Sequence, residues 1–230
     1  MYLPPRDEPT DRHAPAPRGD SSFSTAWPRE PAELTTIYKA GTNVCVLLRA
    51  VEPAIASFAS EVLAAQDLGC SLRVRASRPA LAGLLPPDLA VQGAERFLED
   101  VAFWIEVYGD LFGVEQIGVR LCSLREAMCP RFHVDRVLAR LVCTYHGPGT
   151  EWIDSVDVDR TRLGHRAGGV PDENSGLLRW PDALSRMPTY AVGLLKGEAW
   201  PGNEGRGAVH RSPAITAAQA RRVLLTLESL

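Results

Sequence analysis

The stretch that decides the fold lies at residues 129–152 and reads CPRFHVDRVLARLVCTYHGPGTEW. Near its start, His133 and Asp135 stand two residues apart. In an extended segment, residues i and i+2 project to the same side, so an imidazole and a carboxylate in this spacing can reach one metal ion. The apolar run over residues 137–145 has the length of a strand, and a Gly-Pro-Gly turn follows it. The stretch therefore predicts β structure with candidate metal ligands beside it.

Short strand-like runs continue to the end of the chain. The predicted strands after residue 113 cover residues 118–124, 137–145, 189–195, 207–211 and 221–227. Turns rich in glycine and proline separate several of them. Many short strands with such turns are typical of a sandwich or a barrel.

The first half of the chain has a more helical character. Apolar residues recur three and four positions apart between Phe97 and Tyr108, which predicts an amphipathic helix over residues 88–112. A second helix is predicted over residues 53–66, where a proline stands at the start and its missing N–H costs little. Two strands are predicted at residues 43–49 and 71–76. We therefore expect an α+β fold, a double-stranded β-helix (a cupin-like jelly roll) with the N-terminal helices packed on its sheet.

The N-terminal segment differs in composition from the rest. Residues 1–31 contain seven of the 18 prolines and few aliphatic residues. They cannot bury enough apolar surface to offset the entropy of ordering, so we expect a flexible arm. Residues 32–230 are expected to form a single domain, with a mostly helical part at 32–113 and a β-barrel part at 114–230.

Length and charge exclude several classes of protein. The chain has 230 residues, with 25 basic and 28 acidic side chains and a formal charge of −3. A near-neutral chain is not expected to bind nucleic acid. No stretch approaches about 20 uninterrupted apolar residues, and the acidic, proline-rich start differs from a signal peptide. We therefore expect a cytoplasmic protein without a membrane span, whose five cysteines are free thiols.

Two residues further along the chain complete a pattern. His210 lies 77 residues after His133, and Arg222 follows 12 residues later at the head of the last predicted strand. This layout resembles that of the iron(II)/2-oxoglutarate-dependent oxygenases, and particularly their prolyl-hydroxylase-like branch. The resemblance implies that His133, Asp135 and His210 bind Fe(II) as a facial triad with open positions. It further implies that Arg222, assisted by Tyr145, holds the distal carboxylate of 2-oxoglutarate.

Five motifs carry a second resemblance. They are CPRFHVD at 129–135, TYHGPGTEW at 144–152, LLKGEAWPG at 194–202, VHRSP at 209–213 and RRVLLTL at 221–227. In these motifs the sequence resembles the bacterial family called domain of unknown function 1826, over roughly residues 34–230. That family is reported near zinc-homeostasis genes, so the resemblance implies a link to metal supply and assigns no reaction.

Two functions of different class stay open at this point. The first is an oxygenase that uses Fe(II) and 2-oxoglutarate on a small-molecule or peptide substrate. The second is a non-catalytic, cupin-like protein that binds Zn(II) at the same triad and serves metal homeostasis. Arg222 discriminates between them, because a metal buffer does not need an arginine that points into the barrel. A different zinc site is a further alternative, made from His133 and the cysteines at positions 122, 129 and 143.

A long segment without predicted strands covers residues 154–181. It contains glycines and many arginines and aspartates. Long loops in compact domains are usually functional or disordered. The segment is therefore either a lid over the barrel mouth or a solvated surface insertion.

Overall fold

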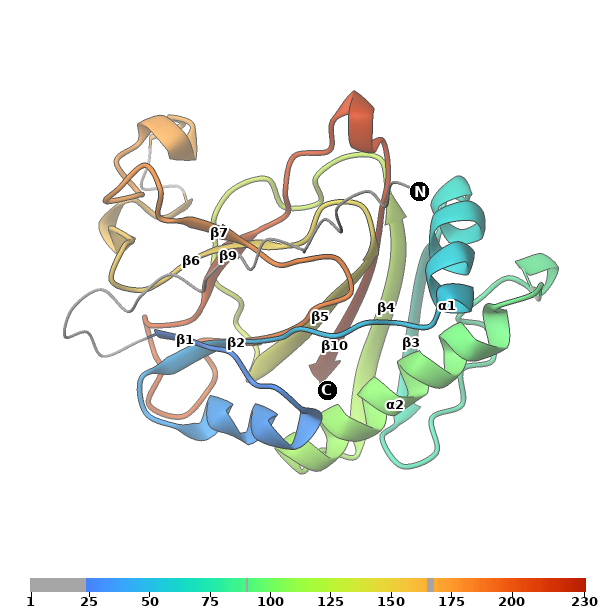
Figure 1. Cartoon of the computed structure of the whole chain (residues 1–230). Coiled ribbons are helices and arrows are strands. Elements are labelled where there is room, and N and C mark those ends of the chain that lie inside the picture. Colours follow the sequence, from blue (N-terminus) through green and yellow to red (C-terminus); the bar gives the residue numbers. More distant parts are fainter. Residues whose placement is uncertain (1–23, 90, 165–167) are drawn as a thin grey trace, which may run out of the picture.

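The computed structural model of the chain describes residues 24–89, 91–164 and 168–230 (Figure 1). Most of the predicted arm, residues 1–23, lies outside the described residues. The rest combines a few helices with strands in two sheets. Within this described part, no helix combines the length and the apolar character needed to cross a bilayer.

The larger sheet has seven strands, and apart from the parallel pair β1 and β2 its neighbouring strands are antiparallel. In spatial order they are β1 (Ser24–Ala26), β2 (Thr42–Leu47), β8 (Val192–Lys196), β5 (Ala139–His146), β10 (Arg222–Ser229), β4 (Gln116–Leu124) and β3 (Gly69–Arg75). The smaller sheet has three strands, in the order β7 (Leu184–Arg186), β6 (Glu151–Ile153) and β9 (Val209–Arg211). His133 extends its edge through an isolated antiparallel bridge with His210.

Seven of these strands overlap the strands predicted from the sequence, whereas β1, β6 and β7 were not predicted. Each of these three strands has only three residues, too few to show an alternating pattern. Strand β1 pairs with β2 from within the segment that the sequence assigned to the arm.

Helical turns occupy both predicted helical regions. The first region is formed by α1 (Pro53–Ser57), the π-helix η2 (Phe58–Val62) and the 3-10 turn η3 (Leu63–Ala65). The second contains α2 (Ala94–Phe112). The remaining 3-10 turns in the described residues include η1 (Pro31–Tyr38), η4 (Pro87–Leu89), η5 (Arg160–Arg162), η7 (Asp172–Asn174) and η8 (Ala217–Gln219).

Helix α2 begins six residues later than the sequence predicts, because Gly93 interrupts the helical pattern. Gly93 has a φ of 92°, a left-handed conformation that favours glycine. A Cβ at this position would lie 2.8 Å from the carbonyl oxygen of Ala54 and 2.9 Å from Cβ of Phe58. The glycine therefore allows the start of α2 to approach the first helical region closely.

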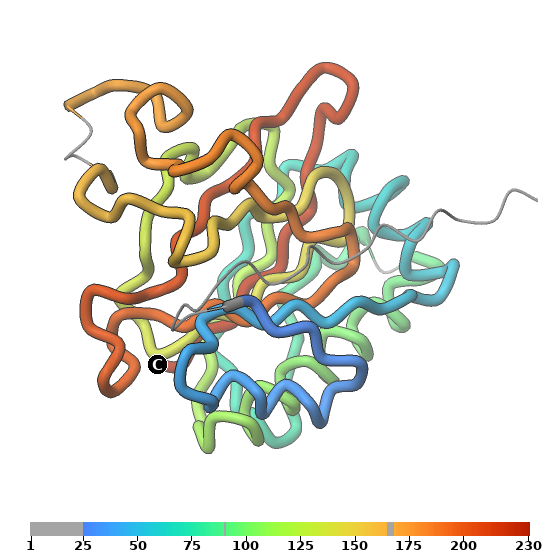
Figure 2. Tube along the Cα trace, turned by 60° about the vertical axis from the view of Figure 1, so that its left-hand side comes forward, coloured from blue at the N-terminus to red at the C-terminus, as the bar shows by residue number. Residues whose placement is uncertain are grey.

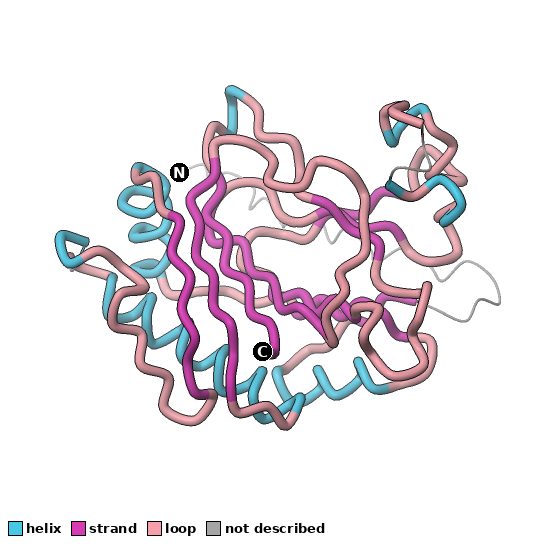
Figure 3. The backbone as a smooth tube through the Cα atoms, turned by 180° about the vertical axis from the view of Figure 1, so that it is seen from behind, coloured by secondary structure: helices cyan, strands magenta, loops and turns pink. Residues whose placement is uncertain are grey.

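The helices cover one face of the larger sheet (Figure 3). Val223, Leu225 and Leu227 of β10 are buried on this face, in one cluster with Phe97 and Trp104 of α2. Alternate residues of a strand point to opposite faces, so the residues between them point the other way. Leu224, for example, belongs to a second cluster.

This second cluster fills the space between the two sheets. Leu224 lies there with Val142 of β5 and Val46 of β2, and Trp152 of β6 comes from the smaller sheet. By the same alternation Arg222, at the start of β10, also points between the sheets. The inner space is thus partly apolar core and partly a site for polar side chains.

The described part of the segment at 154–181 packs on the outer face of the smaller sheet (Figures 1 and 2). Val158 and Leu177 from this segment are buried against Ile153 of β6 and Val209 of β9. The buried carboxylate of Asp172 accepts a 2.7 Å hydrogen bond from the backbone N–H of Phe132. The described part of the segment therefore contributes buried residues to the scaffold. Neither of the two interpretations from the sequence, a lid or a solvated insertion, includes such buried packing.

A polar cluster fastens α2 to the larger sheet. The two carboxylate oxygens of Asp100 accept hydrogen bonds of 2.7 and 2.9 Å from the guanidinium of Arg49. The hydroxyl of Tyr145 donates a 2.5 Å hydrogen bond to Asp100. The Arg49 guanidinium also lies 5.2 Å from the ring centre of Trp104. Both charged side chains are largely buried, at 13% and 14% exposed.

We predict that Asp100→Asn lowers the free energy of unfolding by about 3 kcal/mol, because it leaves the buried Arg49 charge unpaired. Urea denaturation measures this change. Arg96→Gln, on the exposed face of the same helix, is the control and should leave the midpoint unchanged. Equal midpoints for Asp100→Asn and the wild type would contradict the role of this cluster.

Candidate metal centre

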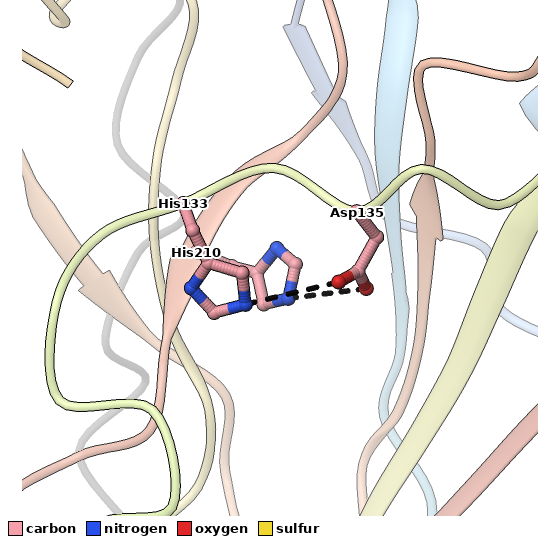
Figure 4. A group of neighbouring side chains, drawn as sticks. All are labelled: His133, Asp135 and His210. Atoms are coloured by element: carbon pink, nitrogen blue, oxygen red, sulfur yellow. Dashed lines mark ion pairs between the residues drawn. The ribbon is translucent and has the colours of Figure 1, made fainter. Parts of the chain in front are cut away.

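Backbone pairing places the two histidines side by side. The N–H of His133 donates to the carbonyl of His210, and the N–H of His210 donates to the carbonyl of His133, each over 3.0 Å. Their ring centres are 4.5 Å apart. Asp135, two residues beyond His133, turns its carboxylate toward both rings (Figure 4). The structure thus brings together the three ligands that the sequence predicted.

The distances within this triad suit one ion. The Nε2 atom of His133 lies 3.7 Å from Oδ1 of Asp135, and Nε2 of His210 lies 3.4 Å from Oδ2. One ligand atom from each residue falls within 4.8 Å of the others. Ligands bound to one ion at about 2.1 Å lie roughly 3 to 4 Å apart. The spacing therefore fits a shared divalent metal.

Backbone carbonyls orient both imidazoles. Nδ1 of His133 lies 2.9 Å from the carbonyl oxygen of Arg131, and Nδ1 of His210 lies 3.0 Å from that of Ala208. A carbonyl only accepts, so Nδ1 carries the proton in each ring and Nε2 keeps its lone pair. This arrangement is the usual outer support of metal-binding histidines.

The charge states of the triad also favour a cation. Burial lowers the pKa of His210 to about 4, so its ring is neutral at pH 7. Burial acts to raise the pKa of Asp135, but its interactions with His210, when that ring is protonated, and with the charge and hydrogen bond of Arg140 outweigh burial and lower this pKa below its usual value. Arg140 donates a 2.6 Å hydrogen bond to Asp135. A neutral imidazole and an ionised carboxylate are the forms that bind metal.

Arg222 lies fully buried between the sheets and forms no ion pair with any described carboxylate. Its guanidinium donates to the hydroxyls of Thr150 at 2.7 Å, Thr144 at 3.1 Å and Ser212 at 3.4 Å. Its Nε has no hydrogen-bond partner among the described residues. Burial lowers the pKa of Arg222 to about 10. It is therefore still a cation at pH 7. Its hydrogen bonds go to hydroxyls alone, and Glu151, which is paired with Arg186 and Arg211, acts on its charge without forming an ion pair with it.

Strand register places this arginine next to the triad. Trp152 of β6 pairs with His210 of β9. Thr150 and Ser212 are each two residues away from one of this pair, so all four side chains share one face of the smaller sheet. Since Arg222 contacts both Thr150 and Ser212, its guanidinium lies about one strand repeat, roughly 7 Å, along from His210.

The structure does not bring Tyr145 to this site, which corrects the role that the sequence assigned to it. Tyr145 points to the opposite face of β5, where it packs against Phe97 and binds Asp100. Its neighbour Thr144 points inward and contacts Arg222 instead. Thr144 pairs with Leu224, which lies on the same face of β10 as Arg222. The signal that identifies Thr144 is therefore its place on the inward face of the strand, whereas Tyr145, the next residue, points to the other face.

The alternative zinc site made from His133 and cysteines is not assembled in the described residues. The group of potential metal ligands there contains the two histidines and Asp135, and no cysteine. Cys129 is exposed, whereas Cys122 and Cys143 are buried free thiols. The sequence did not single out Thr150, Ser212 or Arg140, which carry no distinctive spacing.

A family profile with the description "Protein of unknown function (DUF1826)" matches residues 28–228. The chain belongs to this family. The match confirms the resemblance found in the sequence motifs, and the matched range contains the metal triad and Arg222. A comparison of this DUF1826 chain with curated proteins finds no match.

Three solved structures illustrate what the DUF1826 chain is similar to. A dioxygenase for auxin oxidation from rice shares 13% identity, covering 90% of this chain and 83% of that chain, with a TM-score of 0.46. A Pseudomonas putida prolyl-4-hydroxylase shares 10%, covering 86% and 96%, with a TM-score of 0.40. HygX from Streptomyces hygroscopicus with iron bound shares 10%, covering 88% of each chain, with a TM-score of 0.48.

We predict that His133→Ala and His210→Ala each abolish binding of a divalent metal. The loss should exceed the roughly 10–100-fold weakening that changes outside the ligand set cause. Metal content after purification without a chelating tag, and calorimetric titration, measure it. His146→Ala, at the end of β5 and outside the triad, is the matched control. Unchanged metal content in either triad variant would refute the site.

A second prediction concerns pH in the metal-free protein. Folding lowers the pKa of His210 to about 4 from an ordinary value of 6.5. Between these two pH values the unfolded chain therefore binds a proton at this residue and the folded chain does not. The free energy of unfolding should therefore fall as the pH drops from about 6.5 to about 4. His210→Gln should show a shallower fall in urea denaturation at several pH values. Parallel curves for the variant and the wild type would contradict this assignment.

Proposed function

We propose that this protein is an iron(II)/2-oxoglutarate-dependent oxygenase built on a double-stranded β-helix. The order of strands supports the fold. The larger sheet contains β4, β10, β5 and β8 as neighbours, and the smaller sheet contains the His133 segment, β9, β6 and β7. Along the chain these eight segments alternate between the two sheets, except for β6 and β7, as in a jelly roll of eight strands.

The triad supports Fe(II) as the metal. Two imidazoles and one carboxylate form a facial set of ligands that leaves positions open for other ligands. Zn(II) also accepts this donor set, so the triad by itself does not choose between them. When bound, iron would supply the activation of dioxygen with 2-oxoglutarate as the co-reductant.

The observation that carries the proposal is the buried cation of Arg222. An ionised group inside a protein is costly unless a counter-charge pairs with it, and only hydroxyls contact this guanidinium in the described residues. A carboxylate ligand would supply the missing charge through two parallel hydrogen bonds. A protein that only stored zinc would have no use for such an arginine beside its metal ligands.

The surrounding residues have separate tasks in this proposal. Thr144, Thr150 and Ser212 hold the guanidinium in place for the distal carboxylate of the co-substrate. Arg140 fixes the orientation of Asp135 and keeps it ionised. Trp152, packed beside them, keeps water out of this part of the interior.

Anaerobic titration tests the proposal. Addition of Fe(II) and 2-oxoglutarate together should produce the visible charge-transfer absorption of a chelated 2-oxo acid, and neither addition alone should produce it. Arg222→Gln should weaken 2-oxoglutarate binding by about tenfold or more, since a charged hydrogen-bonded pair is worth about 1.5–3 kcal/mol. Arg125→Gln, an exposed arginine outside the site, is the control.

Stability separates the functional role of Arg222 from a structural one. Because the cation forms no ion pair with a described carboxylate, Arg222→Gln should leave the free energy of unfolding of the metal-free protein equal or higher. Stoichiometric zinc binding without any effect of 2-oxoglutarate would favour the zinc-binding protein instead. A strongly destabilised Arg222→Gln variant would also count against the proposal.

A further inference from the structure

A polar cavity lies on the larger sheet, on the side where Arg140 contacts Asp135. It has a volume of about 400 Å³ and lies over β3, β4 and β10, with Arg140 of β5 at one side. Its polar lining includes Ser71, Arg73, Arg120 and Glu228. This volume is in the range of sites that hold small molecules.

The strand register explains why these side chains gather there. Arg120 of β4 lies opposite Ser71 on β3 and Thr226 on β10. In the next row, Gly118 lies between Arg73 on β3 and Glu228 on β10. Since the glycine has no side chain, Leu230 and Glu228 approach its backbone closely, with Cδ2 of Leu230 only 3.2 Å from the place that a Cβ would take. The same face of β10 carries Arg222 further along, so the cavity and the interior share one surface.

The charge in this cavity is positive and uncompensated. Glu228 is already paired with Arg140 at 2.8 Å, and Arg140 also binds Asp135. The side chains of Arg73 and Arg120 have no hydrogen bond or ion pair with any residue that the structure describes. They stand on adjacent strands, in diagonal positions that long side chains can bridge. Two guanidinium groups are thus available to one oxyanion, in a protein whose formal charge is −3.

Arg140 connects this cavity to the triad. Its Nε contacts Asp135 over 2.6 Å, and its Nη2 contacts Glu228 over 2.8 Å. One side chain therefore forms both the wall of the cavity and the support of a metal ligand. A molecule that contacts Arg140 in the cavity would touch the same side chain that holds Asp135.

We propose that this cavity binds the anionic group, phosphate or carboxylate, of a small-molecule substrate. Arg73 and Arg120 hold that group, and the uncharged remainder of the substrate extends past Arg140 toward the triad. The assignment of the bound molecule as a substrate rests on the proposed oxygenase function. The binding of an anion at Arg73 and Arg120 does not depend on it.

Titration of the full chain with inorganic phosphate, and separately with acetate, tests this site by calorimetry and by phosphorus NMR. The variant Arg73→Gln/Arg120→Gln should bind the preferred anion at least about tenfold more weakly, since each lost charged hydrogen bond is worth about 1.5–3 kcal/mol. Arg96→Gln/Arg125→Gln removes the same charge from exposed positions elsewhere and should bind like the wild type. Preference for phosphate indicates a substrate that carries a phosphate group. Preference for acetate indicates a substrate that carries a carboxylate group.

Several outcomes would overturn the site. One is that the wild type binds neither anion, and another is that binding is weakened equally in the two double variants. Binding that is lost in Arg222→Gln but retained in Arg73→Gln/Arg120→Gln would place the anion at Arg222 and would also overturn the site. Failure of the oxygenase function is distinguishable, because the absorption of the Fe(II) and 2-oxoglutarate complex should be unchanged in Arg73→Gln/Arg120→Gln. If that absorption never forms while anion binding still depends on Arg73 and Arg120, the anion site is confirmed and the proposed oxygenase function is wrong.

Discussion

Two backbone hydrogen bonds, each 3.0 Å long, join His133 to His210 and hold the candidate metal centre together. They connect residues that are 77 positions apart in the sequence. Because paired residues of antiparallel strands lie directly opposite each other, the two imidazoles emerge on one side, and the extended backbone carries Asp135 to the same place. The same bridge extends the edge of the smaller sheet, so the fold and the site depend on one contact.

The interior shows a conflict between stability and function. A core of Leu224, Val142 and Trp152 fills part of the space between the sheets, whereas Arg222 places a cation in the same space without an ion pair among the described residues. Such an arrangement lowers the free energy of unfolding, and proteins retain it where the buried charge is needed to bind a ligand. Three hydroxyls reduce the cost by satisfying donors of the guanidinium, and they leave its charge for an anion.

Much of this architecture could be predicted from the sequence, and the exceptions have physical reasons. The three residues of the candidate metal centre follow from the His-x-Asp spacing and the second histidine, and the long amphipathic helix follows from its apolar period. The role of Tyr145 was wrong because the sequence does not say which face of β5 looks inward, whereas the structure shows that Thr144 does. The packing of the described part of residues 154–181 on the smaller sheet was missed because Val158 stands between two aspartates and the pair Leu177 and Leu178 is too short to show a period.

Conversion of 2-oxoglutarate tests the central claim most directly, that the triad and Arg222 act on one bound co-substrate. The full-length protein with Fe(II), 2-oxoglutarate and ascorbate in air should release one succinate and one carbon dioxide for each 2-oxoglutarate consumed. Ascorbate supplies the electrons that a substrate would otherwise provide. Mass spectrometry of succinate should show slow but catalytic formation by the wild type and none by His210→Ala. Succinate formation that is equal in the two proteins, or absent from the iron-loaded wild type, would contradict the account.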